Sequence, residues 1–253
     1  MEIIPVKLTG CVVRLEPLSE KHVPDLTVAA HDERIWRYML YDYPDNEEKM
    51  LAWVRDILAR QAACTDLAFA VIHLASGRAI GATRYLEIRP EHRSLEVGGT
   101  WYATEFQHTA VNTECKYLLL KHAFEVLGCI RVQFKTDARN QRSLRAIERL
   151  GAVREGVLRN HYILPDGTVR DSVFFSIVDK EWPGVKARLE GFLRKKLVAS
   201  CHFEEQRDEE SPIIEYPQQA GNYKDSPAQL PRPTGSQRPE RSLASGQSSE
   251  RQQ

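Results

Sequence analysis

The sequence lacks several features that mark whole classes of protein. Lysine plus arginine number 35 and aspartate plus glutamate also number 35, so neither charge is in surplus. A protein that binds nucleic acid or a membrane surface mainly by electrostatics needs a surplus of basic charge. No apolar run approaches the ~20 residues that cross a bilayer, and residues 1–7 show no secretory signal. The sequence therefore predicts a cytoplasmic protein that binds neither membrane nor nucleic acid.

Paired cysteines and metal-ligand spacings are missing as well. The five cysteines contain no Cys-x-x-Cys pair; they are Cys11, Cys64, Cys115, Cys129 and Cys201. An odd number of widely spaced cysteines disfavours a disulfide framework and a zinc site, and it indicates reduced thiols with structural roles. The histidines show no His-Glu-x-x-His spacing. We therefore expect no metal ion.

Composition divides the chain near residue 199. Residues 201–253 are rich in proline, serine, glutamine, glutamate and arginine, and they contain few apolar residues. Such a segment cannot bury enough apolar surface to offset the entropy that is lost when it becomes ordered. We predict one folded domain over residues 1–198 and a disordered tail over residues 199–253.

Strands and helices alternate within residues 1–198. Hydrophobic patterning predicts strands at 12–15, 67–74, 79–87, 94–102, 130–136, 156–164 and 168–178. It predicts helices after Ser19 and at 46–63, 113–127, 140–150 and 183–197. Gly128 and Gly151 are typical helix stops, and Pro165-Asp166-Gly167 is a strong hairpin turn. These elements predict an α/β (α+β) domain with a mixed sheet and helices on its faces.

Two strand-to-helix connections carry the chemistry. The first is a polar loop, Gln107–Asn112, that opens a helix at Thr113. A helix N-terminus offers unpaired N–H groups and the positive end of the helix dipole, so it can hold a phosphate. Every such turn has this property, so for this loop taken alone a simple structural connector is the better interpretation.

The second connection is more specific. Residues 140–152 read Asn-Gln-Arg-Ser, then Leu-Arg-Ala, then Ile-Glu-Arg-Leu-Gly-Ala, and residues 155–161 read Glu-Gly-Val-Leu-Arg-Asn-His. Together with the Asp-Gly turn and the order of elements over residues 8–183, this resembles the GNAT superfamily of N-acetyltransferases. Within it, the chain is similar to the branch that includes the ribosomal-protein N-terminal acetyltransferases. The resemblance implies a mixed, mostly antiparallel central sheet of about seven strands with helices on both faces.

The resemblance also implies a reaction and its binding residues. Acetyl-CoA would be the donor, and the acceptor would be a primary amine, either a protein N-terminal α-amine or a small-molecule amine. The protein would be a monomer or a homodimer, with direct acetyl transfer. In the family, backbone N–H groups at a bulge bind the pantetheine arm, a loop wraps the pyrophosphate, and an asparagine with a nearby serine bonds the acetyl region. The matching residues here are Trp101, Tyr102, Ala103, Gln107, His108, Thr109, Ala110, Val111, Asn112, Thr113, Asn140 and Ser143.

Two positions depart from the family pattern. The loop at 107–112 has no glycine, although glycine allows close backbone approach to a phosphate. A positive φ at Ala110 would be strained, and the side chains of His108 and Thr109 are expected to donate instead. Where many members place a tyrosine that protonates the leaving thiolate, this chain has Ile147, which we expect in the core. The departures keep open an alternative function, an inactive acyl-CoA-binding or regulatory module.

Acetyl transfer needs a base, because an alkylamine attacks only when it is neutral and its ordinary pKa is about 10. Glu96 matches a glutamate that related enzymes use in this way, and we predict it as the general base. His161, Tyr162 or a water molecule are the alternatives. The CoA thiolate resembles that of cysteine, with a pKa of about 8.5, and needs little help from an acid. Ser143 or water would supply it, so Glu96, Asn140 and Ser143 are the predicted catalytic residues.

Overall fold

The computed structural model describes residues 1–209, and it describes their side chains as far as Lys195. Its strands are β1 (Leu8–Thr9), β2 (Val13–Pro17), β3 (Leu67–His73), β4 (Ala79–Arg89), β5 (Ser94–Tyr102), β6 (Arg131–Asp137), β7 (Val153–Ile163) and β8 (Val169–Val178). Its α-helices are α1 (Val23–Ala29), α2 (Glu47–Ala62), α3 (Val111–Lys121), α4 (Gln141–Leu150) and α5 (Trp182–Glu209). Short 3-10 turns occur at η1 (Glu20–His22), η2 (Glu33–Ile35), η3 (Pro90–His92) and η4 (Thr104–Phe106), and η5 (His122–Val126) is a π turn.

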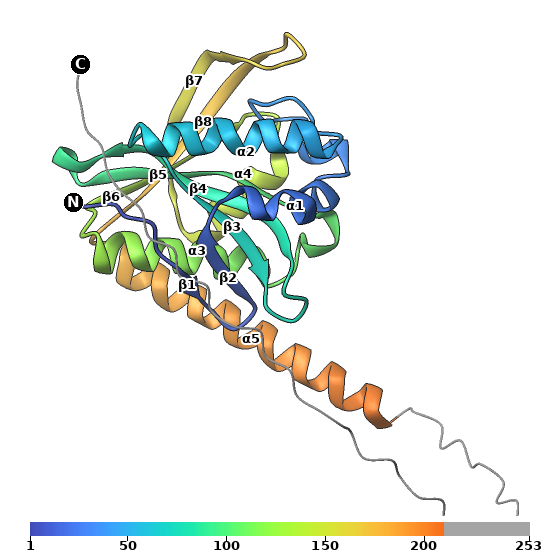
Figure 1. The fold of residues 1–253 in the computed structure, drawn as a ribbon. Coiled ribbons are helices and arrows are strands. Elements are labelled where there is room, and N and C mark those ends of the chain that lie inside the picture. The colour runs from blue at the N-terminus through green and yellow to red at the C-terminus, as the bar shows by residue number, and fades with distance from the viewer. Residues whose placement is uncertain (210–253) are drawn as a thin grey trace, which may run out of the picture. The chain divides into compact units, whose positions relative to one another are not determined.

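The strands form one sheet in the order β1-β2-β3-β4-β5-β6-β8-β7 (Figure 1). All neighbours pair in antiparallel fashion except β5 and β6, which run parallel. These two strands pair only through Ser94–Glu96 and Arg131–Gln133, and beyond those residues they part. The predicted mixed, mostly antiparallel sheet is confirmed, and the short β1 adds an eighth strand to the seven that patterning predicted.

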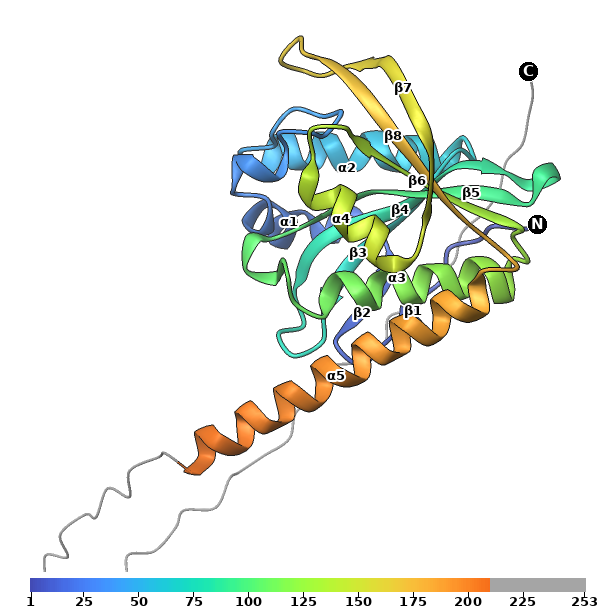
Figure 2. The same cartoon turned by 180° about the vertical axis from the view of Figure 1, so that it is seen from behind.

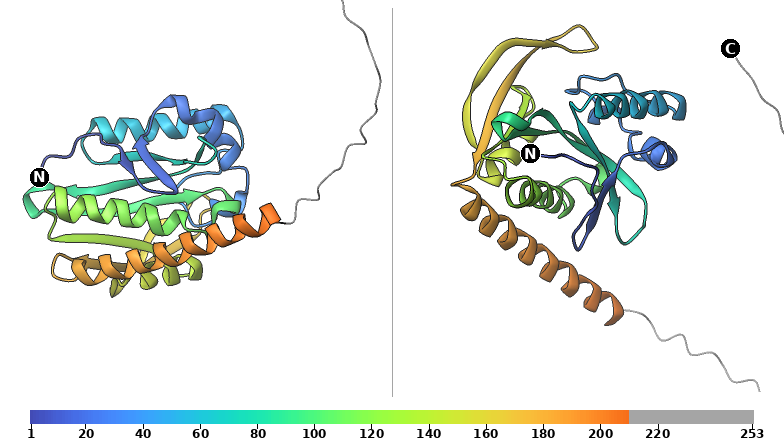
Figure 3. Two further views of the ribbon diagram at one scale, coloured as in Figure 1. Left: turned by 90° about the horizontal axis from the view of Figure 1, so that it is seen from below. Right: turned by 60° about the vertical axis from the view of Figure 1, so that its left-hand side comes forward.

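Helices cover both faces of this sheet, as predicted. The helices α1 and α2 lie on one face, and α3 lies on the other beside α5 (Figures 1 and 2). The view from below in Figure 3 shows these layers in section. Buried apolar residues form a separate core on each side, with Leu26 and Ile57 on the first and Leu119 and Leu189 on the second. Each face therefore excludes water independently of the other.

Local capping explains where the helices begin. Asn46 caps α2 by accepting a hydrogen bond from the N–H of Lys49 at 2.9 Å. The helix predicted after Ser19 starts as the turn η1 and becomes α-helical at Val23. The helix predicted at Thr113 starts two residues earlier, because the Thr109 hydroxyl accepts a hydrogen bond from the N–H of Val111 at 3.2 Å.

The last helix is longer than predicted. We expected it to end at residue 197, but α5 continues to Glu209, so residues 199–209 of the predicted tail are helical. Residues 210–253, the remainder of that predicted tail, lie outside the described residues. Among residues 1–209, no helix is both long enough and apolar enough to cross a membrane.

Candidate functional site

The end of β5 bulges next to the point where β5 and β6 part. Gly98 lies opposite Arg84 and Trp101 lies opposite Ala82, so β5 has one residue more than β4 between these pairs. Gly99 takes up the extra residue in the left-handed conformation, with φ of +56°. A Cβ there would lie 2.6 Å from Arg84 Nε. The bulge therefore needs glycine at this position.

The three residues predicted to bind pantetheine follow this bulge. Trp101 packs against Trp36 and Trp53 on the α1–α2 face, with ring centroids 5.1 and 5.8 Å away. Tyr102 points to the other face, where its hydroxyl donates to Asn112 Oδ1 at 3.3 Å. The N–H of Ala103 donates to the carbonyl of Ile80 at 2.9 Å, so this predicted donor already has an acceptor.

The loop before α3 contains no glycine, and its positive φ angle falls on a residue other than Ala110. A positive φ would be strained at Ala110, and Ala110 avoids it, because it is right-handed with φ of −70°. The positive φ falls on His108, at +64°. As at any helix start, the N–H groups of Asn112 and Thr113 in the first turn of α3 have no acceptor within the helix.

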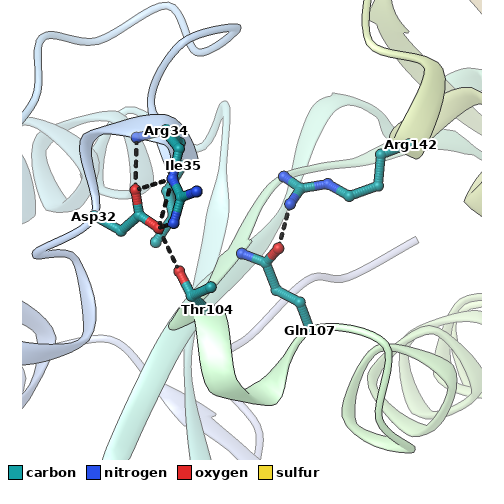
Figure 4. Close-up of a pocket in the computed structure, with 6 residues that line it drawn as sticks. All are labelled: Asp32, Arg34, Ile35, Thr104, Gln107 and Arg142. Carbon is teal, nitrogen blue, oxygen red and sulfur yellow. Dashed lines mark hydrogen bonds and ion pairs between the residues drawn. The ribbon is translucent and has the colours of Figure 1, made fainter.

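A basic side chain from α4 reaches this loop. Arg142 donates to the side-chain carbonyl of Gln107 (Figure 4). This bond links the start of α4 to the loop before α3. Both residues line a pocket, together with Asp32, Arg34, Ile35 and Thr104. Arg149 of α4 donates to the buried hydroxyl of Thr113 at 2.8 Å. Two arginines of α4 thus lie at the N-terminus of α3, where the helix dipole is also positive.

Asn140 and Ser143 meet at the start of α4, as their spacing predicts. Asn140 Oδ1 accepts from the N–H of Ser143 at 3.1 Å and so caps the helix. The Asn140 amide NH₂ donates to no group within the described part of the chain. Sequence reasoning missed the turn that holds them: Asp137 is buried and accepts from Arg139 Nη2 at 2.7 Å, and this arginine lowers the pKa of Asp137.

Glu96 is buried beside the bulge, with 2% of its surface exposed. Its Oε2 accepts from Gln133 at 2.9 Å and lies 3.0 Å from the Lys135 ammonium. Burial raises the pKa of Glu96, against the opposing effect of Lys135. A Cβ at Gly98 would lie 3.0 Å from Oε1, so this second oxygen lies along β5 toward the bulge. Glu96 can therefore exchange a proton there while Oε2 stays anchored.

The two alternative bases lie near the same lysine. The Lys135 ammonium is 5.7 Å from the centroid of the Tyr162 ring, and that ring contacts His161 in a tilted arrangement, with centroids 4.0 Å apart. His161 Nδ1 is buried and has no partner among the described residues. Burial, with Lys135 and Arg170, lowers the pKa of His161. The structure thus brings all three predicted base candidates together around Lys135.

Sequence reasoning did not identify two charged residues of α3, because the sequence does not show that this part of the helix is buried. Glu114 is buried and accepts from the N–H groups of residues 11–13 at 2.7–2.8 Å. Lys116 is also buried, and its ammonium donates to Thr100 Oγ1 at 2.6 Å. Only the order of elements, which places α3 between the sheet and α5, signals that polar residues on this helix become buried. Within residues 1–209, no group of three His, Cys, Asp or Glu side chains is arranged to hold a metal ion.

Known proteins match the part of the chain that carries this geometry. Residues 13–153 match the family model described as an acetyltransferase (GNAT) domain. One curated relative is a Bacillus subtilis (strain 168) protein, YdaF, provisionally named a ribosomal N-acetyltransferase. It is 33% identical over 95 residues, which cover 38% of this chain and 51% of YdaF. The chain thus spans about half the length of this curated relative.

Solved structures match over a longer part of the chain. A provisionally named acetyltransferase from T. thermophilus is 42% identical with a TM-score of 0.70, covering 76% of this chain and 100% of that one. A GCN5-related N-acetyltransferase from Brucella melitensis is 29% identical with a TM-score of 0.71, covering 76% and 86%. Both structures therefore share one architecture with the greater part of this chain.

Proposed function

The chain belongs to the GNAT acetyltransferase family, and from this premise we propose that it transfers acetyl from acetyl-CoA to the α-amine of a protein N-terminus. The protein acceptor is suggested by YdaF, which is provisionally named a ribosomal N-acetyltransferase. A small-molecule amine is the second acceptor class. The observation that carries the proposal is the parting of β5 and β6 between two polar helix starts, those of α3 and α4.

The donors around this opening fit acetyl-CoA. The backbone N–H groups of Asn112 and Thr113 belong to the first turn of α3, at the positive end of its dipole, and Arg142 adds a cation beside this turn. Phosphate oxygens are well served by this combination. The free amide of Asn140 suits a carbonyl of the pantetheine arm or of the acetyl group. In the proposal, binding of the pyrophosphate replaces the bond between Arg142 and Gln107.

Glu96 takes the proton of the attacking amine in this proposal. The amine is largely an ammonium at neutral pH, so it must lose a proton before it attacks. Oε1 of Glu96 lies beside Gly98, while Gln133 and Lys135 hold Oε2 in place. A pKa raised by burial makes this carboxylate a stronger base than an exposed glutamate. Ser143 or a water molecule supplies a proton to the leaving thiolate.

The proposal is tested first by binding and then by turnover. At a concentration about 100 times its Kd, acetyl-CoA should add roughly 2.7 kcal/mol of stability to the folded protein. Peptides with free N-termini and a panel of small amines are then offered with acetyl-CoA, and thiol release is followed. Mass spectrometry locates the acetyl group on the product.

Three outcomes decide between the alternatives. Release of thiol with acetyl on a peptide α-amine supports the proposal. Acetyl found only on small amines moves the acceptor to the second class. Tight acetyl-CoA binding without transfer to any amine favours the alternative, an inactive acyl-CoA-binding or regulatory module.

A further inference from the structure

Lys116 carries a buried ammonium group that the proposed function does not use. It lies on α3, is 7% exposed, and donates to the hydroxyl of Thr100 at 2.6 Å. Thr100 directly follows the left-handed Gly99 and belongs to the β5 bulge. Its hydroxyl also lies 2.8 Å from that of Thr83 on β4, and it donates a longer bond, 3.4 Å, to the carbonyl of Gly98, from which it would turn to reach a ligand. The lysine therefore contacts the sheet at the bulge itself.

No carboxylate compensates this charge within the described part of the chain. The titratable groups facing it from β4 and β5 are Tyr85 and Tyr102, and burial raises the pKa of both phenols. On α3 itself, burial raises the pKa of the Cys115 thiol to about 12, so it stays neutral. Glu114 is turned away, toward the N–H groups of residues 11–13.

The other neighbours add no negative charge. Arg149 of α4 lies nearby at Thr113 and is also a cation. Burial lowers the pKa of Lys116 to about 8, which measures how poorly the site solvates its charge. On the opposite face of the sheet, Arg84 packs against Gly99. The bulge is therefore flanked by one cation on each face, and only Arg84 has a carboxylate, Asp66, at 3.1 Å.

An uncompensated buried cation costs stability unless a ligand supplies the missing charge. In the proposed reaction, the amine nitrogen bonds to the acetyl carbon and the carbon–sulfur bond breaks. The sulfur leaves with the electron pair, and the amine proton goes to Glu96. Negative charge thus appears on the sulfur and needs a stabilising group nearby.

We propose that Lys116 is a positioning residue for acetyl transfer, whose ammonium acts through the Thr100 hydroxyl to stabilise the thiolate that leaves at the bulge. This inference rests on the proposed function. It gives the leaving group a stabilising charge in a chain that has the buried, apolar Ile147 at the position of the expected acid. It also explains why the fold retains a lysine where an apolar side chain would pack at lower cost.

The first test needs no acceptor. CoA is bound to the unmodified protein, and the pKa of its thiol is measured from the ultraviolet absorbance of the thiolate as pH rises. The same titration is run on Lys116→Met, Lys116→Arg and, as a matched control, Lys121→Met, which removes an exposed lysine from the same helix. We expect the thiol pKa to be highest in Lys116→Met and lowest in Lys116→Arg, whose charge persists at every pH, and to be unchanged in Lys121→Met.

The second test is kinetic. We expect kcat of Lys116→Met to fall about tenfold at pH 7, with an unchanged KM for acetyl-CoA. Because the unmodified lysine loses its proton near pH 8, the ratio of the two rates should approach one at higher pH. Lys116→Arg keeps its charge throughout and should retain its advantage over Lys116→Met at alkaline pH. A purely structural lysine would produce none of this pH dependence.

Stability separates the readings further. A structural role predicts that Lys116→Met melts at a lower temperature, whereas the proposal predicts a higher one together with slower turnover. Thr100→Val is the second variant: it leaves the lysine in place, removes the hydroxyl, and should raise the thiol pKa in the same direction. A bound thiol with the unmodified pKa in both variants would overturn this inference alone. Failure of the unmodified protein to bind CoA would overturn the proposed function as well.

Discussion

Glu96 and Glu114 are two buried glutamates that hold their charge in different ways. Both oxygens of Glu114 are filled by the N–H groups of residues 11–13 at 2.7–2.8 Å. Only one oxygen of Glu96 is held, at 3.0 Å from Lys135, and the other lies along β5 toward Gly98. The exposed fractions of the two residues are nearly the same, 3% for Glu114 and 2% for Glu96. The unfilled acceptor position of Glu96 therefore supports the proposed reactive role of this residue, because burial alone does not distinguish the two carboxylates.

The largest effect expected from this comparison is on turnover. Glu96→Gln keeps the shape and removes the base, so kcat at pH 7 should fall by about 10²- to 10⁴-fold. The loss should shrink as pH rises and the amine deprotonates without help. Because burial raises the pKa of Glu96, kcat of the unmodified protein should fall as pH drops through that raised value. Steady-state kinetics over a range of pH values measures all three.

The control for Glu96→Gln is Glu91→Gln, which removes an exposed carboxylate from the turn η3 between β4 and β5. It should leave kcat and its pH profile unchanged. Acetyl-CoA affinity should also be unchanged in Glu96→Gln, as measured by calorimetry. A Glu96→Gln protein with full activity and a lower melting temperature would show that Glu96 is a structural residue like Glu114. The proposed difference between the two glutamates would then be wrong.

The matching change at the other carboxylate should act on stability. Glu114→Gln puts an NH₂ group against backbone donors that need an acceptor, which should cost about 1–3 kcal/mol. For a domain of this size, each kcal/mol lowers Tm by roughly 2–4 °C. Scanning calorimetry gives the shift, and kcat measured well below Tm should stay normal. An unchanged Tm with impaired turnover would reverse the assignments of the two glutamates.

Lys116 extends the comparison from buried carboxylates to a buried cation. The pKa of Lys116 is lowered from 10.5 to about 8, so the unfolded chain holds a proton there that the folded chain loses between these values. The resulting penalty, about 3 kcal/mol at most, is complete below pH 8 and disappears by pH 10.5. Lys116→Met should therefore be more stable than the unmodified protein at pH 7, and the gain should vanish at alkaline pH. Urea unfolding at both pH values checks this, and a gain that is independent of pH would contradict it.

A further effect on stability, of about the same size, concerns the bulge toward which Glu96 points. Gly99→Ala must hold alanine at φ of +56° with its Cβ against Arg84, which should cost about 1–3 kcal/mol. Gly156→Ala is the matched control, because nothing lies within 4 Å of a Cβ there. Thermal melting of both variants measures the difference. Equal melting temperatures would show that the bulge tolerates a side chain.

The parts of the fold that local rules govern were predictable from sequence. Asn46 and Asn140 cap their helices as their positions indicate. Gly151 and Gly167 take the positive φ that a helix end and a tight turn require, +101° and +80°. Ile147 is buried in the core as its helical spacing predicts. In each case the deciding contacts lie within a few residues along the chain.

The site could be predicted only in outline, because its details depend on contacts between distant residues. Glu114 bonds to the N–H of Cys11, 103 residues away, and no local pattern reports such a contact. Lys116 stands in a helix that is covered by the sheet on one side and α5 on the other, so its position in the helix did not reveal its burial. The positive φ at His108 rather than Ala110 depends on where α3 starts, which Thr109 decides.

The short pairing of β5 with β6 also has a consequence for local opening of the sheet. Three residue pairs join β5 to β6, whereas seven join β6 to β8. Few backbone hydrogen bonds across a pair of strands lower the free energy that is needed to separate them locally. We expect the amide hydrogens between β5 and β6 to exchange with solvent faster than those between β6 and β8. The opening that would bind acetyl-CoA then lies where the sheet separates most readily.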